Sequence, residues 1–100
     1  MGFTRHTFPI RMIDGWERPI EIVSGWRYGD FGFHKGIKGR WIATDLYSGT
    51  RICTGQTRKE CLEKIENNMK RIEQRYEEPS YIQKVMEFKE LLKKESEEME

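Results

Sequence analysis

The sequence has few of the residues that build cross-linked or metal-dependent proteins. It contains two cysteines, Cys53 and Cys61, and two histidines, His6 and His34, in 100 residues. Neither cysteine belongs to a Cys-x-x-Cys motif, and the spacing of these four residues matches no structural zinc site. We therefore predict two reduced thiols, no disulfide framework, and no metal or other cofactor.

Long hydrophobic runs are also missing. No apolar stretch approaches the roughly 20 residues that a membrane-spanning helix needs, and the N-terminus has no hydrophobic signal segment. Charged residues make up 35% of the chain, so most of its surface must be solvated. These features predict a cytoplasmic protein with no membrane partner.

The net charge of +1 is unevenly divided along the chain. Residues 1–58 contain nine Lys and Arg and five Asp and Glu, a net charge of +4. Residues 59–100 contain nine Lys and Arg and twelve Asp and Glu, a net charge of −3. An anionic partner is therefore expected to meet the first half of the chain. A solvated helical tail with ordinary Glu–Lys pairing is the simpler explanation of the same asymmetry.

The first 56 residues show the alternation of an antiparallel sheet. Apolar and polar residues alternate over Thr7–Ile13 and Trp16–Val23, and Asp14-Gly15 between them is a hairpin signal. Residues that favour strands predict two more, Arg40–Tyr47 and Thr50–Thr54, joined by a tight Ser-Gly turn. We expect an α+β fold whose antiparallel sheet has three to four strands in a β-meander.

The periodicity changes to that of a helix after the sheet. Thr57 and Glu60 form a capping box, in which the Thr57 hydroxyl accepts from the Glu60 amide and the Glu60 carboxylate reaches back to the Thr57 amide. Apolar residues then recur every three or four positions and predict one helix over residues 57–78. The proline at position 79 ends it, and a second helix is expected over residues 79–97. The chain is thus a single domain with two C-terminal helices.

The apolar positions of the first predicted helix form one continuous seam. They are Leu62, Ile65, Met69, Ile72 and Tyr76. Such a seam usually packs against the core of its own domain. A sheet of four short strands offers too little surface to cover two long helices, so part of the seam is also expected to be the face of a homodimer.

The segment Gly25–Trp41 has an unusual composition. It combines five glycines, five aromatic residues and four cations with a single acidic residue, Asp30. Glycine permits close approach, aromatic rings offer stacking area, and cations attract phosphate or carboxylate. We expect a recognition loop or a long hairpin arm, although one or two of its aromatic side chains can instead fill the core. The candidate partner-binding residues are Trp26, Arg27, Tyr28, Phe31, His34, Lys35, Lys38 and Arg40.

No catalytic signature accompanies this segment. His34 follows Asp30 by four residues, but the segment has no nucleophile with an orienting partner. The glycine spacing matches neither a Walker loop nor a GxGxxG turn that leads into a helix. We therefore predict that the protein is not an enzyme.

Two short segments resemble a known family. Residues 41–49 (WIATDLYSG) and 54–62 (TGQTRKECL) resemble the strand–turn–strand–GxTxxEA–helix stretch of HicB-type antitoxins. The motif residues that match are Gly55, Thr57 and Glu60, and Cys61 replaces the usual alanine. The resemblance covers about a quarter of the chain and implies a local sheet-plus-helix fold. The family continues with a further strand, whereas this chain continues with a second predicted helix.

In overall character the chain resembles the small, highly charged accessory proteins of phages and mobile elements, including anti-defence and anti-CRISPR inhibitors. That resemblance implies a binding protein that occupies and inhibits a host or defence-system protein. Two alternatives stay open. One is a nucleic-acid-binding module that uses the basic aromatic face of the sheet. The other is a small-ligand or nucleotide-derivative binder lined by Trp26, Tyr28 and Trp41.

The predicted seam leads to a test of oligomeric state. If the helices hold a homodimer, light scattering at tens of micromolar protein will give twice the mass of one chain. The Ile72→Glu variant will then dissociate or unfold, because it places a charge in an apolar contact. A monomeric wild type would contradict the dimer. An Ile72→Glu variant with unchanged assembly and melting temperature would contradict the seam itself.

Overall fold

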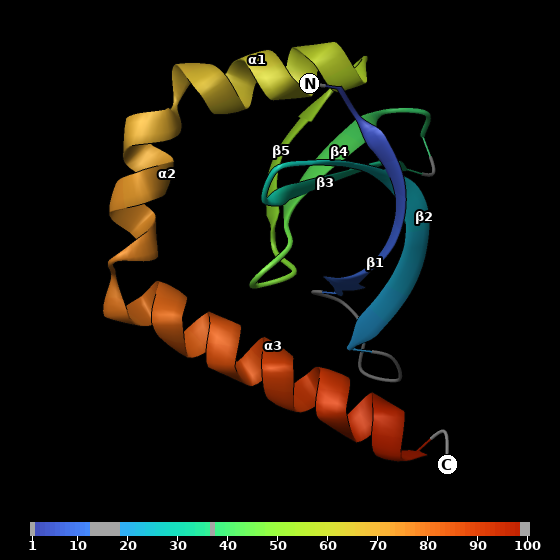
Figure 1. Ribbon diagram of the computed structural model, residues 1–100, viewed down its shortest axis with the longest axis vertical. Coiled ribbons are helices and arrows are strands. Elements are labelled where there is room, and N and C mark those ends of the chain that lie inside the picture. The colour runs from blue at the N-terminus through green and yellow to red at the C-terminus, as the bar shows by residue number, and fades with distance from the viewer. Residues whose placement is uncertain (1, 13–18, 37, 99–100) are drawn as a thin grey trace.

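A five-stranded antiparallel sheet followed by three helices makes up the computed structural model, which describes residues 2–12, 19–36 and 38–98 (Figure 1). The strands are β1 (Thr4–Arg11), β2 (Ile20–Tyr28), β3 (Phe31–Lys35), β4 (Trp41–Asp45) and β5 (Arg51–Gly55). The helices are α1 (Arg58–Asn67), α2 (Met69–Tyr76) and α3 (Pro79–Glu98). Each strand pairs with the next along the chain. The α+β class and the meander are therefore confirmed.

The predicted number of strands was too low, because β3 lies inside the glycine-rich segment. This segment contains the end of β2, a tight turn at Gly29-Asp30 and all of β3. Gly29 has a φ of +59°, a backbone conformation that favours glycine. Most of the segment is thus a hairpin paired within the sheet, which is the second of the two predicted alternatives, and not a loop. The predicted Asp14-Gly15 turn lies outside the described residues.

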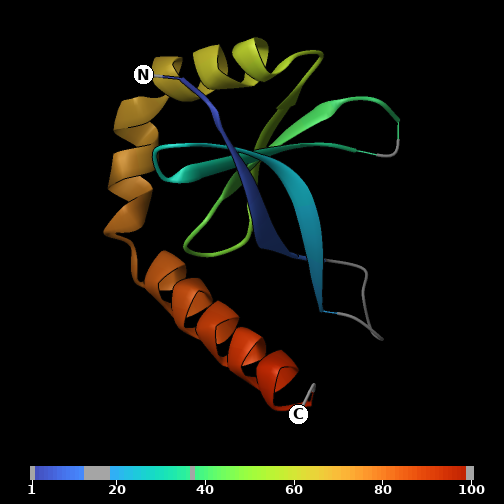
Figure 2. The same ribbon diagram turned by 45° about the vertical axis from the view of Figure 1, so that its right-hand side comes forward.

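The helix predicted over residues 57–78 is in fact two helices. Asn68 interrupts it with φ −116° and ψ 17°, and its side-chain amide donates to the backbone carbonyl of Lys64 (2.8 Å). Asparagine competes with helix hydrogen bonds in this way. The Asn67-Asn68 pair was the sequence signal for the break. As a result, α1 and α2 run in different directions along the sheet (Figure 1, Figure 2).

One face of the sheet is covered by α1 and α2. A row of paired residues across β2 to β5 faces them: Trp26, Phe33, Ala43 and Cys53. The helices contribute the predicted seam to the same core: Leu62, Ile65, Met69, Ile72 and Tyr76. Phe33 and Ala43 are completely buried. The seam therefore packs against the sheet of its own chain.

The homodimer stays a prediction, but the helix surface that it could use differs from the predicted seam. Ile65 and Ile72 are buried in the core, because a fifth strand and the break at Asn68 bring the seam onto the sheet. On α3, by contrast, Ile82 and Met86 lie one turn apart and are 49% and 62% exposed. Contact between helices of two copies would therefore use α3.

The opposite face of the sheet is concave because Phe8 folds over it. The Phe8 side chain is 1% exposed, and its ring lies over Gly32, two strands away on β3. A Cβ atom on Gly32 would lie only 2.7 Å from that ring. The sheet must curl strongly for β1 to reach β3. At the other end of β1, the Arg11 amide donates to the Gly49 carbonyl of the β4–β5 turn (2.8 Å).

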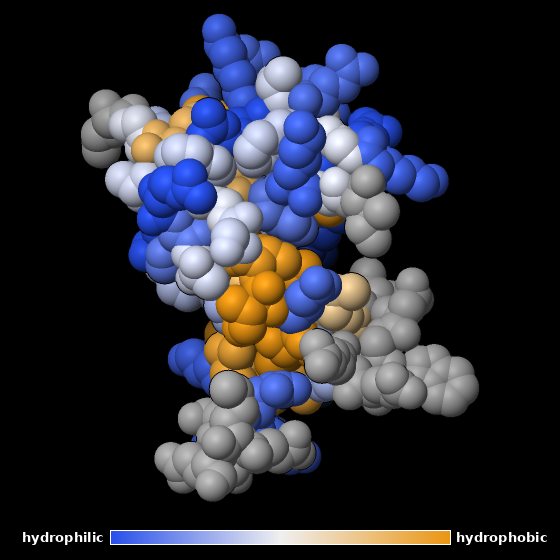
Figure 3. Space-filling view, turned by 90° about the vertical axis from the view of Figure 1, so that its right-hand side faces the viewer, coloured by the Kyte–Doolittle hydropathy of each residue, from blue (hydrophilic) through white to orange (hydrophobic). Residues whose placement is uncertain are grey.

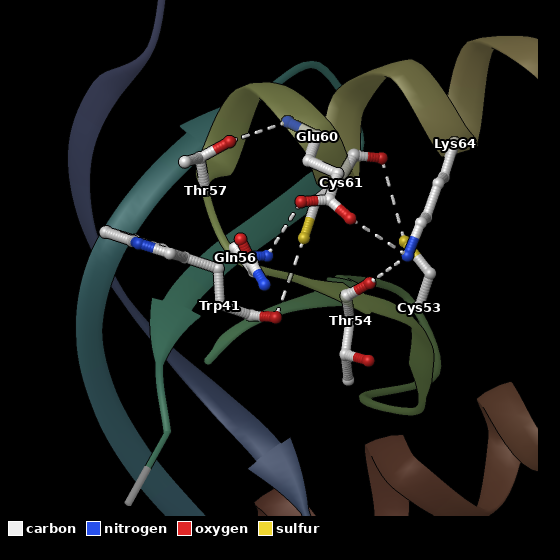
Figure 4. A network of polar contacts seen from close by, with 8 residues as sticks. All are labelled: Trp41, Cys53, Thr54, Gln56, Thr57, Glu60, Cys61 and Lys64. Carbon is white, nitrogen blue, oxygen red and sulfur yellow. Dashed lines mark hydrogen bonds and ion pairs between the residues drawn. The ribbon is translucent and has the colours of Figure 1, made fainter. Parts of the chain in front are cut away.

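The junction between β5 and α1 is held by side-chain and backbone bonds (Figure 4). The Thr57 hydroxyl accepts from the Glu60 amide (3.0 Å), as predicted. The Glu60 carboxylate accepts from the amide of Gln56 (3.0 Å) and not from that of Thr57, so this half of the capping box was misplaced by one residue. Lys64 Nζ donates to the Thr54 carbonyl (2.7 Å). A lysine at this position protects the outer edge of β5.

Both cysteines are free thiols, as predicted. Cys61 is completely buried, and its Sγ donates to the Trp41 carbonyl (3.6 Å; Figure 4). Burial raises the pKa of the Cys61 thiol to about 11. A buried thiol of this kind is chemically inert and belongs to the core.

α3 is attached to the sheet at the end of β4 and at the β4–β5 turn. It begins at Pro79, as predicted. Its Tyr81 hydroxyl donates to the buried Asp45 carboxylate (2.6 Å). Further along, the ring of Phe88 lies over Gly49, whose φ is +70° and where a Cβ atom would overlap the ring. Both contacts place α3 beside the end of the sheet that carries the β4–β5 turn.

The Gly32→Ala variant tests the contact that curls the sheet. The added methyl group would press on the ring of Phe8 and on the side chain of Leu46, so we expect a loss of about 1–3 kcal/mol in unfolding free energy. Chemical denaturation measures this loss. Gly2→Ala is the control, because a Cβ atom there meets nothing within 4 Å. The loss should shrink in a Phe8→Leu background, and equal losses in both backgrounds would contradict the contact.

Candidate binding pocket on the concave face

The concave face lines an open cavity of about 500 Å³. All five strands or their connecting turns contribute to its lining, from Ile10 at the end of β1 to Thr54 on β5. The volume lies within the range of pockets that hold small molecules or side chains of a partner. We call this feature the concave cavity.

The register of the strands explains how the floor of the concave cavity is assembled. His34 pairs with Ile42, and Ile42 pairs with Thr54, so these three side chains form a row across β3, β4 and β5. Ile10 and Glu21 form a pair on the β1–β2 side of the cavity. Successive side chains of a strand point to opposite faces. This row therefore lies on the opposite face of the sheet from Trp26, Phe33, Ala43 and Cys53, the row beneath α1.

His34 is a buried polar residue in this floor. It is 7% exposed, and its Nδ1 atom has no hydrogen-bond partner within the described part of the chain. The ring of Phe8 lies edge-on to it, with the ring centres 6.0 Å apart. Burial lowers the pKa of His34, and the negative charge of Glu21 opposes this effect more weakly. The imidazole is therefore mainly neutral at neutral pH.

Cations dominate the mouth of the concave cavity. Lys38, Arg40 and Arg51 line it and are exposed, and none of them forms an ion pair with another described residue. Arg11 also lines the cavity, but it is paired with a glutamate of α3 (3.1 Å). Glu21 is the single acidic residue in the described lining. The uncompensated charge at the mouth is therefore positive and attracts anions.

The structure divides the predicted partner-binding residues between the two faces. Those that line the concave cavity are His34, Lys38 and Arg40. Those that join the core beneath the helices are Trp26, Tyr28 and Phe31. Arg27 and Lys35 are exposed outside the cavity, and the Arg27 guanidinium donates to the Gly29 carbonyl of its own hairpin (2.8 Å). Trp41 also packs against the core, so the three rings proposed to line a small-ligand site are core residues.

Sequence reasoning missed part of the site. Arg51 and Glu21 lie in segments that were correctly expected to be strands, but a charged residue in an alternating strand signals only an exposed position. Ile42 was correctly placed in a strand, but the sequence did not indicate which face of the sheet its side chain occupies. Only the register across five strands brings these residues to the same cavity as His34.

A second group of cations and aromatic rings lies at the start of α1. The Arg58 guanidinium carbon is 4.3 Å from the ring centre of Trp26, 5.4 Å from Trp41 and 5.0 Å from Phe3. Arg5 lies 5.2 Å from the same Trp26 ring. These cation–π contacts join α1 to the sheet. The group thus has a role within the fold, whereas Lys38, Arg40 and Arg51 at the concave cavity form no ion pair with another described residue.

Comparison with models of known protein families finds no match for this chain, and comparisons with curated proteins and with solved structures find none either. β4, β5 and α1 follow one another in the order of the segment that resembles HicB-type antitoxins, an order that many unrelated folds share. Among the described residues, no group of three or more His, Cys, Asp or Glu could hold a metal ion, and no helix is long and apolar enough to cross a membrane.

The burial of His34 should make stability depend on pH. Because its pKa is lower in the folded chain than the unfolded value of 6.5, its contribution is fully present above that value. The contribution is lost as the pH falls through the folded pKa. We expect the melting temperature of the wild type to fall more steeply below neutral pH than that of His34→Gln. A His34→Gln slope equal to that of the wild type would contradict the assignment.

Proposed function

We propose that this protein is a non-enzymatic binding protein that holds an acidic segment of a partner protein at the concave cavity. The observation that carries the proposal is the group of three cations at the mouth, Lys38, Arg40 and Arg51, which form no ion pair with a described residue; the described lining contains a single carboxylate, that of Glu21. Charges that serve only solubility are usually interspersed with the opposite sign. Cations gathered around a cavity instead attract an anionic partner and orient it.

The lining of the cavity favours a protein partner over a nucleic acid. Single-stranded nucleic acids bind to grooves in which aromatic side chains stack on the bases. Ile10, Met12 and Ile42 give this cavity an aliphatic lining, and the tryptophans of the sheet lie on the other face. An aliphatic floor with cations around it is complementary to apolar and acidic side chains of a protein segment.

The biological role we propose is occupation and inhibition of a host or defence-system protein, as expected of a small accessory protein from a phage or mobile element. Binding of an acidic segment would block that surface of the partner by simple steric exclusion. The proposed setting is the cytoplasm, where thiols such as Cys53 and Cys61 stay reduced.

Removing the cations at the mouth tests this function. The test measures, by fluorescence anisotropy, the affinity for short labelled peptides that carry several glutamates around one leucine. The triple variant Lys38→Ala, Arg40→Ala, Arg51→Ala should bind them about tenfold or more weakly, because it removes the charges that attract the segment. The control variant Lys59→Ala, Lys70→Ala, Lys84→Ala removes the same charge from exposed helix positions and should bind like the wild type.

Three results would contradict the proposal. The first is no binding of any acidic peptide by the wild type. The second is equal weakening in both triple variants, which would indicate only the net charge of the chain. The third is tighter binding of single-stranded DNA than of peptides, with a steep salt dependence, which would support a nucleic-acid-binding module instead.

A further inference from the structure

We infer that the concave cavity selects an acidic segment by one apolar side chain, which it holds on its floor while neighbouring carboxylates meet the cations at the mouth. This inference rests on the proposed function and specifies what is recognised. The recognised element is a large apolar residue with acidic residues on either side of it.

The floor has the chemistry of a site for an apolar anchor. Ile10 and Ile42 are half-buried in the unbound protein, and Met12 is 37% exposed, so an occupant would remove further apolar surface from water. Methionine adapts its shape to different occupants. A cavity of about 500 Å³ accommodates one large side chain together with adjoining backbone.

His34 favours a peptide over a plain hydrocarbon in this position. Buried polar side-chain atoms nearly always have a hydrogen-bond partner. Nδ1 of His34 has none within the described residues, although the side chain is more than nine-tenths buried and lines the cavity. A peptide brings backbone amide and carbonyl groups into the cavity, whereas a hydrocarbon chain brings no polar partner.

The charges at the mouth are arranged unevenly and orient the segment. Lys38 and Arg40 belong to the β3–β4 connection, and Arg51 begins β5, so these three cations lie toward the later strands. Glu21 lies on the β2 side, where it repels a carboxylate. The carboxylates of the segment would therefore lie toward β4 and β5.

Apolar surface also extends on the β1–β2 side of the molecule. Figure 3 views this side and shows hydrophobic residues gathered below a largely hydrophilic region. Among the large hydrophobic residues of these two strands and their flanks, Met12 and Ile22 are the exposed ones described here. Met12 also lines the concave cavity, whereas Ile22 follows Glu21 on β2 and therefore points to the opposite face of the sheet.

The inference is tested with a series of labelled acidic peptides that differ at one central position. Glycine, leucine and phenylalanine are placed there with identical charges on both sides. We expect the leucine and phenylalanine peptides to bind the wild type about tenfold or more tightly than the glycine peptide, because burial of the side chain contributes only in those two.

Two variants then test whether the central apolar side chain of the peptide binds on the floor of the concave cavity. Thr54→Phe fills part of the floor without changing charge, and Met12→Ala removes apolar surface from it. Both should reduce the difference between the leucine and glycine peptides to less than about threefold, while the glycine peptide keeps its wild-type affinity. Ile22→Phe enlarges an exposed side chain that does not line the cavity and serves as the control. Melting curves establish that each variant is folded.

The possible results separate this inference from the proposed function. If all peptides bind the wild type equally and the triple cation variant weakens them, the anchor is wrong and the proposed function stands. If the leucine preference persists in both Thr54→Phe and Met12→Ala, the anchor lies elsewhere and the inference is overturned. If no acidic peptide binds, the proposed function fails, and the inference fails with it.

Discussion

The contact between Phe8 and Gly32 is the constraint on which the concave face depends. Because Gly32 has no side chain, the Phe8 ring can lie directly on the backbone of β3, and β1 curls across the sheet. The curl brings the amide of Arg11 to the carbonyl of Gly49. It also shapes the open cavity that His34 lines. A flat sheet with the same residues would present its cations on an open surface and would have no floor to bury an apolar group.

Asp45 links the position of α3 to the β4–β5 turn. A buried carboxylate is costly unless it accepts hydrogen bonds, and Asp45 accepts from the hydroxyls of Tyr81 (2.6 Å) and Ser48 (2.7 Å). Burial is the main reason that the pKa of Tyr81 is raised, and the Asp45 hydrogen bond adds to it. The helix therefore holds in place the turn that leads into β5. Arg51, at the mouth of the concave cavity, directly follows this turn.

The two faces of the sheet have different physical roles. Aromatic and aliphatic side chains beneath α1 and α2 stabilise the fold by burial, and Arg58 completes this layer by covering the Trp26 ring. On the concave face Arg11 is paired with Glu87, but Lys38, Arg40 and Arg51 form no ion pair with another described residue. Exposed charges of this kind contribute little to stability. Lys38, Arg40 and Arg51 are therefore available for a partner at little cost to the fold.

Local signals in the sequence determined the α+β class, the cap at Thr57 and the start of α3 at Pro79, because capping and proline geometry act within a few residues. They also identified His34 as a candidate, since it is close in sequence to a cluster of cations. The sequence left open whether the glycine-rich segment is a loop or a hairpin, because the stability of β3 comes from pairing with β2 and β4 and not from its composition. Only the tertiary structure decided which face each side chain occupies. Arg51 and Glu21 are 30 residues apart in the chain, and the register and curl of five strands bring them to one cavity.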